Sequence, residues 1–277
     1  MEDLIQALAP QEGRIDASSL PQDHPLLAMV VDVARAAMED LGIGLATIKR
    51  DQNGRWQRHP GPDDRRITGL NGLADPQQRL LFSGPAAAVF RQRQRMGYDD
   101  GLGDRVIGTF ANCAGGQTPW GTMLSAEENF QDQVVERVHA DGSSPPPSER
   151  PFRCDGDRLS GLGNPFRLAG NKYGWIVEVD PEKPRQPAVK HSWLGRFRHE
   201  AVAIRAVPGL QLQVYSGCDR HGGHLYRFVS EEIVRDPADP SNSRLLERGR
   251  LEVARFDPPG ADGRGQGRWM ALDPNLS

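Results

Sequence analysis

Cysteines and excess charge of one sign are both scarce in this sequence, and each scarcity excludes a class of protein. The three cysteines of the 277-residue chain, Cys113, Cys154 and Cys218, are widely spaced and odd in number. This argues against a disulfide framework and leaves at least one thiol free for other chemistry. Basic residues number 34 and acidic residues 37, interspersed along the chain, for a net charge of -3. Neither nucleic acid nor an anionic membrane surface is therefore expected as a partner.

Long apolar runs are missing as well. No segment is long and apolar enough to span a bilayer, so we expect no membrane insertion. The first ten residues, MEDLIQALAP, lack the basic, apolar and small-residue regions of a signal peptide. We therefore expect no export signal within this chain.

Glycine and proline, in contrast, are abundant. The 31 glycines and 22 prolines, with only 6% aromatic residues, indicate many turns joining short elements, which favours a β-rich fold. Strand candidates separated by turn-rich gaps occur at 173–179, 189–193, 201–206, 212–216, 225–229 and 251–256. This spacing is typical of a sandwich, a barrel or a propeller, although no repeat of fixed period is visible.

Helical periodicity is found in the N-terminal third. Residues 26–41 carry apolar side chains at helical spacing and predict a helix that ends at Gly42. Residues 85–96 are a second, more polar helix candidate, and residues 4–15 are a weak one. These helices are expected to decorate a β-rich body.

Two segments are predicted to be turns or loops at the surface. The turn 51–54 lies between the strand-like residues 43–48 and 55–58, which indicates a hairpin. Residues 141–150, DGSSPPPSER, contain three consecutive prolines and few apolar residues, so they predict a surface loop.

The most unusual stretch is residues 112–129, NCAGGQTPWGTMLSAEEN. Its glycines and Thr-Pro bend predict that Cys113 lies on a tight loop and not inside a regular element. A short strand at 120–125 would then present Glu127 and Glu128 at its far end. A thiolate and two carboxylates are anionic donors suited to a metal ion. Spacing alone supports two interpretations equally, namely a metal site and a glycine-rich hairpin with an incidental buried cysteine.

A second candidate site residue lies in LGRFRHEAVAI, residues 194–204. Glu200 is predicted at the start of an apolar strand, where a carboxylate needs a partner. In isolation the segment favours a structural ion pair with Arg196 or Arg198 over a metal site.

The third candidate segment is residues 214–229, VYSGCDRHGGHLYRFV. Cys218, His221 and His224 have a zinc-like spacing, but the usual paired cysteine is missing, so zinc is not favoured. Asp219, at the end of a predicted strand, is a candidate oxygen ligand for a hard cation.

Residues 112–130 resemble the signature of the PhoX family of alkaline phosphatases, a group long called a domain of unknown function. In that signature an Asn-Cys-Ala-x-Gly-x-Thr-Pro-Trp-Gly-Thr core leads to a Glu-Glu-Asn-Phe end. Further motifs follow in the family's order: DRRIT at 64–68, SGPAA at 83–87, YGWIVEVDP at 173–181, LGRFRHEA at 194–201, GCD at 217–219, LYRFVS at 225–230 and LEVARFD at 251–257. The resemblance extends from about residue 64 to the C-terminus, and residues 1–60 match weakly.

The resemblance implies an all-β fold, a six-bladed β-propeller with a cluster of Fe³⁺ and Ca²⁺ on its axis, which hydrolyses phosphate monoesters. Cys113 matches the family's iron-binding cysteine, and Glu200 matches a carboxylate ligand of iron. Glu128, with Glu127 beside it, matches the acidic pair that helps to hold the calcium and iron ions. The family also implies a monomer that acts on small-molecule phosphate esters in the periplasm or outside the cell.

The sequence also departs from the family pattern. It lacks the twin-arginine signal, the opening blade with its Asn-His-Glu segment, and the later Asp-Arg-Pro-Glu-Trp-like segment that supplies another iron ligand and a phosphate-binding arginine. We therefore expect residues 1–277 to be an internal fragment with only part of the blades, open sheet edges and an incomplete site. The alternatives are a non-catalytic calcium-binding propeller that binds a protein or glycan, and a calcium-dependent propeller esterase or lactonase.

Overall fold

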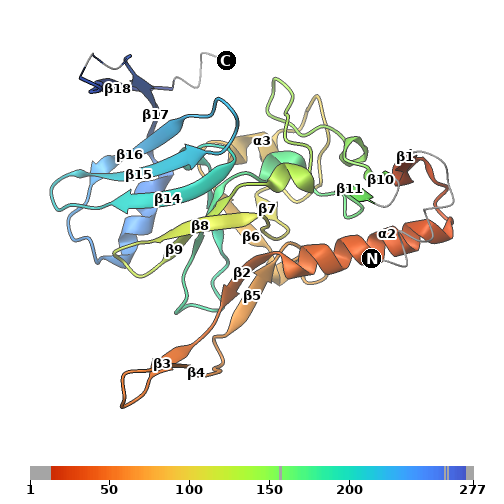
Figure 1. Cartoon of the computed structure of the whole chain (residues 1–277), viewed down its shortest axis with the longest axis horizontal. Helices are drawn as coiled ribbons and strands as arrows, with labels where there is room; N and C mark the ends of the chain where they lie inside the picture. Colours follow the sequence, from red (N-terminus) through yellow and green to blue (C-terminus); the bar gives the residue numbers. More distant parts are fainter. Residues whose placement is uncertain (1–13, 156–157, 259, 261, 273–277) are drawn as a thin grey trace.

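Short strands joined by turns make up most of the regular structure, which confirms the β-rich fold expected from composition (Figure 1). The computed structural model describes residues 14–155, 158–258, 260 and 262–272. In this part of the chain the α-helices are α2 (Pro25–Asp40) and α3 (Ala87–Arg91). Neither helix is long and apolar enough to cross a membrane.

The larger of the two main sheets has six strands. In spatial order they are β7 (Arg105–Val106), β6 (Leu80–Ser83), β13 (Val189–His191), β12 (Ile176–Val179), β9 (Met123–Glu127) and β8 (Asn112–Gln117). All neighbours are antiparallel except β6 and β13, which run parallel. Phe82, Phe110, Tyr173 and Val177 are buried in the main core cluster beside this sheet. The sheet thus joins segments far apart in the sequence.

The second main sheet is an antiparallel meander of five strands. Its order is β14 (His199–Arg205), β15 (Gln211–Cys218), β16 (Leu225–Ile233), β17 (Gly249–Phe256) and β18 (Gly267–Ala271). Along β15 buried residues alternate with partly exposed ones up to Ser216, as expected for a strand with one face on a core. Leu212, Val214 and Phe228 are buried in that core.

The two sheets meet where β14 packs against β8 and β9. A Cβ atom added at Gly116 in β8 would lie 2.6 Å from the carbonyl oxygen of Val202 in β14, so only glycine allows this close approach. The contact packs β8 alongside β14. The candidate ligands Cys113 and Glu200 lie near the starts of these two strands.

The N-terminal region adds a helix and small sheets to the body. Helix α2 begins at Pro25 after the cap His24, whose Nδ1 accepts from the amide of Leu26 at 3.2 Å. The helix buries Leu26, Val30, Ala34 and Met38, four residues apart on one face. Strands β1 (Arg14–Asp16), β10 (Phe152–Asp155) and β11 (Arg158–Leu162) form one small sheet, and β2 (Gly42–Leu45) pairs with β5 (Arg65–Thr68). The hairpin of β3 (Ile48–Arg50) and β4 (Trp56–Arg58) extends away from the body in Figure 1.

Short 3₁₀ helices occupy several of the connections. They are η1 (Ala17–Ser19), η2 (Pro76–Gln78), η3 (Phe130–Asp132), η4 (Pro147–Glu149), η5 (Gly170–Lys172), η6 (Ser192–Leu194) and η7 (Pro240–Glu247).

The helix predicted at 26–41 is confirmed to within one residue, but other local predictions need correction. The predicted helix at 85–96 is reduced to α3, because the backbone is already extended at Gln92. Of the weak helix at 4–15, residues 4–13 lie outside the described residues, and Arg14 and Ile15 belong to β1. The predicted hairpin is confirmed only for β3 and β4, since β2 pairs with β5 instead.

The segment 141–150 is not simply a surface loop. Ser143, Ser144, Pro145 and Pro147 are buried, and the Ser144 hydroxyl accepts from the amide of Gly170 at 2.9 Å. The prolines and serines therefore pack against the body, which composition alone did not indicate.

A closed ring of blades is not formed by the described residues, whose sheets have three, six, five, two and two strands. The structure thus confirms the mostly β fold.

Candidate metal centre

Two β-bulges occur in the strands that pack together where the sheets meet, one in β8 and one in β14. In β8 the residues Cys113 and Ala114 lie opposite the single residue Ala126, because Asn112 pairs with Glu127 and Gly115 with Ser125. In β14 the residues Glu200 and Ala201 lie opposite Gly217 in the same way. Bulges bend a strand and redirect a side chain, and they are frequent next to functional sites. The prediction that Cys113 lies outside regular structure is wrong, because it lies in β8 at this irregularity.

The thiol of Cys113 is exposed and has carboxylates as neighbours. A hydrogen bond to the Glu128 side chain raises the pKa of the Cys113 thiol, as do partial burial and the negative charges of Glu128 and Glu200. The structure therefore brings together a thiol and two carboxylates from β8, from the end of β9 and from β14. Cys113 is not the buried cysteine that the alternative interpretation of its hairpin required.

Glu128 lies just beyond β9 and is largely buried. Its amide donates to the carbonyl of Ala111 at 2.9 Å. Ala111 has φ of 55°, an uncommon conformation for a residue with a side chain. The chain is therefore strained immediately before the strand that carries Cys113.

Glu127 points to the other side and is fully buried. Its Oε1 accepts from Lys190 Nζ at 2.6 Å and from Thr109 Oγ1 at 2.7 Å. Its Oε2 accepts from the amides of Gly174 and Trp175 at 2.9 and 3.1 Å. With four donors on two oxygens, Glu127 acts as a structural anchor in this arrangement, and Glu128 is the member of the pair that faces Cys113.

Glu200 does not form the ion pair expected of it. Arg198 instead pairs with Glu136, with 2.7 Å between Nη2 and Oε2, and Arg220 contacts the same carboxylate. The guanidinium of Arg196 donates to the backbone carbonyls of Tyr173, Gly170 and Glu136. Burial lowers the pKa of Arg196 to about 10, which is still charged at neutral pH. Glu200 is left exposed near Cys113.

Asp219 follows β15 and is exposed. Its amide donates to the carbonyl of Arg198 at 3.0 Å, so its backbone lies beside a residue that comes two positions before Glu200 in the sequence. Among the described residues, no three His, Cys, Asp or Glu side chains already converge tightly enough to hold a metal ion. Cys113, Glu128 and Glu200 are thus neighbours, and not a closed set of ligands.

Two polar clusters were missed in the sequence. One is the cluster around Glu136, a residue in a loop with no motif of its own. The other is Glu178, whose Oε2 lies 2.9 Å from His191 Nε2 while its Oε1 accepts from Trp120, Thr122 and Ser243. Glu178 and His191 line a cavity of about 440 Å³. The sequence predicted a strand at 173–179 from its alternation of large apolar and other residues. It could not predict the partners of Glu178, because they come from distant segments.

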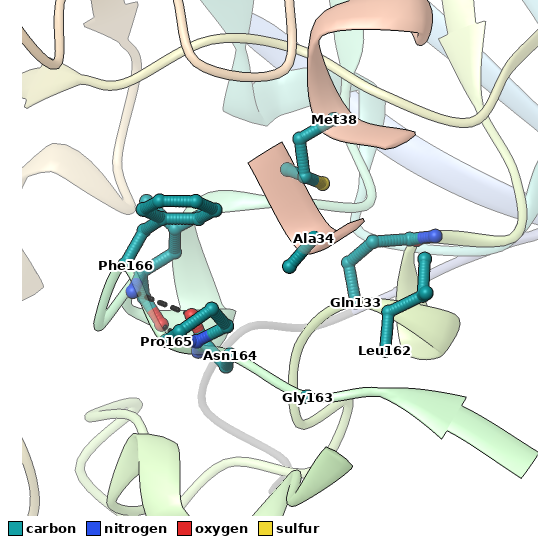
Figure 2. Close-up of a pocket in the computed structure, with 9 residues that line it drawn as sticks. Ala34, Met38, Gln133, Leu162, Gly163, Asn164, Pro165 and Phe166 are labelled. Atoms are coloured by element: carbon teal, nitrogen blue, oxygen red, sulfur yellow. Dashed lines mark hydrogen bonds between the residues drawn. The ribbon is translucent and has the colours of Figure 1, made fainter. Parts of the chain in front are cut away.

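A smaller cavity lies between α2 and the loop at 162–168, and Figure 2 shows Ala34, Met38 and Gln133 lining it. Its volume of about 10 Å³ is at most enough for one water molecule. None of the candidate ligands lines it.

Comparison with known proteins gave a family and a solved structure. The family model described as alkaline phosphatase PhoX matches residues 13–275. The chain is similar in structure to Pseudomonas fluorescens PhoX in complex with vanadate, a transition state analogue, with a TM-score of 0.67 and 32% sequence identity. The match covers 86% of this chain and 41% of that chain, so the sequence spans less than half the length of the solved relative. No curated protein sequence matches the chain.

Proposed function

This chain belongs to the PhoX family of alkaline phosphatases, and from that membership we propose that its candidate metal centre serves the hydrolysis of phosphate monoesters. The observation that carries the proposal is that Glu128 and Glu200 are neighbours of Cys113, with Cys113 and Glu200 each in a β-bulge. The similar solved protein was captured with vanadate, a transition state analogue. A phosphate-like oxyanion is therefore the expected ligand of this site.

The chemistry of these donors fits a cluster of Fe³⁺ and Ca²⁺. Two neighbouring carboxylates raise the pKa of the Cys113 thiol, so without a cation the thiol resists ionisation, and bound cations would reverse that effect. A thiolate suits iron, and carboxylates suit both ferric iron and calcium. Cys113 and Glu200 would hold iron, and Glu128, with Glu127 beside it, would help to hold the calcium and iron ions. Asp219 remains a candidate calcium ligand from its position after β15.

Each ligand has a separate task in this proposal. Cations bound here would contact phosphate oxygens, offset the charge that develops in the transition state and activate an oxygen nucleophile. Cys113 provides the soft donor, and the bulge in β8 directs it to the outside of the hairpin. Glu128 and Glu200 provide the negative charge that keeps the cations at the end of the strands. The exposure of Cys113 and Glu200 leaves this end accessible to a phosphate ester.

The finer features of the family are part of the same proposal. We take the five-stranded sheet of β14 to β18 as material for one blade of a six-bladed propeller, of which this chain supplies a part. The same proposal takes the protein to be a monomer that acts in the periplasm or outside the cell. We propose the phosphatase activity for a full-length protein that includes residues 1–277.

The test combines metal binding with an oxyanion probe. Residues 1–277 are supplied with Fe³⁺ and Ca²⁺, and iron content, the thiolate-to-iron charge-transfer absorption and vanadate binding are measured. We expect iron to bind with a visible charge-transfer band, and vanadate to perturb that band. Calcium binding without iron and without vanadate binding would instead favour a non-catalytic calcium-binding module. Glu182→Gln, a change at an exposed carboxylate outside the site, is the matched control for Glu200→Gln, which should weaken iron binding.

A further inference from the structure

A buried ion pair lies next to the candidate ligands. It joins Glu127, in the same hairpin, to Lys190 of β13. Glu127 and Lys190 are both 0% exposed, and Lys190 Nζ lies 4.1 Å from the centre of the Tyr173 ring. The ammonium also donates to the carbonyl of Lys172 at 3.1 Å. Charges in such a place are retained only if partners satisfy them, and here every oxygen of Glu127 has two donors.

Thr109 connects this ion pair to the residue before the thiol. Its hydroxyl, itself 0% exposed, donates to Glu127 at 2.7 Å and accepts from Asn112 Nδ2 at 3.0 Å. Asn112 also donates to Ser125 Oγ at 3.1 Å, across the hairpin. Asn112 and Glu127 are directly paired in the sheet.

Consecutive residues are joined by a rigid peptide unit, so fixing one residue limits the position of the next. Asn112 precedes Cys113, and Glu127 precedes Glu128. Thr109 and Lys190 hold Asn112 and Glu127, and the residues that follow these two, Cys113 and Glu128, contact each other at the candidate metal centre. The same arrangement reaches the third ligand, because Gly174 donates its amide to Glu127 and accepts from the amide of Phe197, three residues before Glu200.

We infer that Thr109 and Lys190 are positioning residues, which hold the ligands Cys113 and Glu128 in register through Asn112 and Glu127. This inference rests on the proposed metal function of Cys113. Residues behind metal ligands commonly tune affinity, with losses of about ten- to a hundredfold when they are changed. A hydroxyl that bridges Asn112 and Glu127 is suited to this task, because it satisfies one group while it fixes the other.

The test uses a hydroxyl that can be replaced by a methyl group with little change in the shape of the side chain. Thr109→Val deletes the bridge, and Thr109→Ser keeps it. Thr118→Val is the matched control, because Thr118 is a buried threonine of the same hairpin that bonds to Thr122 at the opposite end. Iron affinity is measured by equilibrium dialysis, the geometry of the thiolate by the position of the charge-transfer band, and folding by thermal unfolding without metal.

We expect Thr109→Val to weaken iron binding by about ten- to a hundredfold and to shift the charge-transfer band. Thr109→Ser and Thr118→Val should bind iron like the unchanged chain. Equal iron affinity for Thr109→Val and Thr118→Val would overturn the inference and leave the proposed function in place. If the unchanged chain binds no iron, the metal centre and the inference fail together.

A second pair of variants tests the ion pair itself. Lys190→Met breaks the contact with Glu127, and Lys172→Met breaks another buried ion pair, in which Lys172 Nζ lies 2.7 Å from Asp100. Both leave a buried carboxylate without its cation, so both should lower the unfolding temperature. Among folded samples, only Lys190→Met should lower iron affinity, and an equal loss for Lys172→Met would overturn the role of Lys190. If Lys190→Met does not fold, the iron affinities of the Thr109 and Thr118 variants test the inference instead.

Discussion

Cys113 and Glu200 occupy corresponding positions in two β-bulges, each being the first of the two residues opposite a single partner. Their strands, β8 and β14, belong to different sheets that pack together at the candidate metal centre. The charge of Glu200 helps to raise the pKa of the Cys113 thiol. Two irregularities in separate sheets thus produce one anionic site.

Replacement of the thiol should remove iron selectively. Cys113→Ser substitutes a neutral hydroxyl for a thiolate, so we expect iron content and the charge-transfer band to be lost. Iron content is measured by elemental analysis after removal of free metal. Cys218→Ser is the control, because Cys218 is half-buried and not part of the proposed ligand set. Iron content in Cys113→Ser equal to that of the unchanged chain would contradict the assignment.

Removal of one carboxylate should have opposite effects on stability and on metal binding. Glu200→Gln relieves the repulsion between negative groups at the metal-free site, so the unfolding temperature without metal should rise by up to about 3 °C. Iron affinity should fall, because an amide is a weaker ligand than a carboxylate. Calorimetry with and without Fe³⁺ measures both effects. A lower unfolding temperature without metal would show that Glu200 has a stabilising partner.

The close approach of the sheets should not tolerate a methyl group at Gly116. A Cβ there would lie 2.6 Å from the Val202 carbonyl, so we expect Gly116→Ala to destabilise the fold by about 1–3 kcal/mol. Gly44→Ala is the control, because a Cβ at Gly44 has open space around it. Denaturant unfolding of both variants measures the difference. Equal stability of the two would show that the sheets do not touch at Gly116.

Acid should destabilise the protein through Glu178. Burial opposes its ionisation, but hydrogen bonds from His191, Thr122 and Ser243 and the charge of His191 outweigh burial and lower its pKa from 4.5 to about 2. The unfolded chain therefore takes up a proton before the folded one, and stability present above pH 4.5 is lost as the pH falls towards 2. The loss should amount to about 3 kcal/mol.

Unfolding free energies measured from pH 6 to pH 2 test this prediction. Glu178→Gln should be less stable at neutral pH and should show a flatter dependence in the acid range. Glu182→Gln, at an exposed position, should keep the slope of the unchanged chain. An unchanged slope in Glu178→Gln would remove Glu178 as the cause of acid sensitivity.

Residues 1–277 by themselves should hydrolyse phosphate esters slowly. Within the described residues the candidate donors lie close together without forming a closed set of three, so bound cations would be loosely held. Loss of one positioned group at such a site can reduce the rate by about a hundredfold or more. An aryl phosphate assay with Fe³⁺ and Ca²⁺, beside Pseudomonas fluorescens PhoX, gives the comparison. Comparable turnover would show that these residues hold a complete site.

Local sequence determined the family, the β-rich composition and the positions of the strands from β12 to β17. The signature around Cys113 led to the family that the comparison then established, because the motif is long and its spacing is set by chemistry along one hairpin. The helix at 26–41 was predictable for a similar reason, since its apolar face repeats within the segment itself.

Only the tertiary structure decided which charges pair. Glu127 and Glu128 are adjacent and alike in sequence, yet one is held by Lys190 and the other faces Cys113. Arg198 pairs with Glu136, which lies in a loop without a motif, and not with the neighbouring Glu200. Strand alternation sends neighbouring side chains to opposite faces, and the partners on each face come from distant segments. Such pairing depends on how the sheets pack, so it could not be inferred from spacing along the chain.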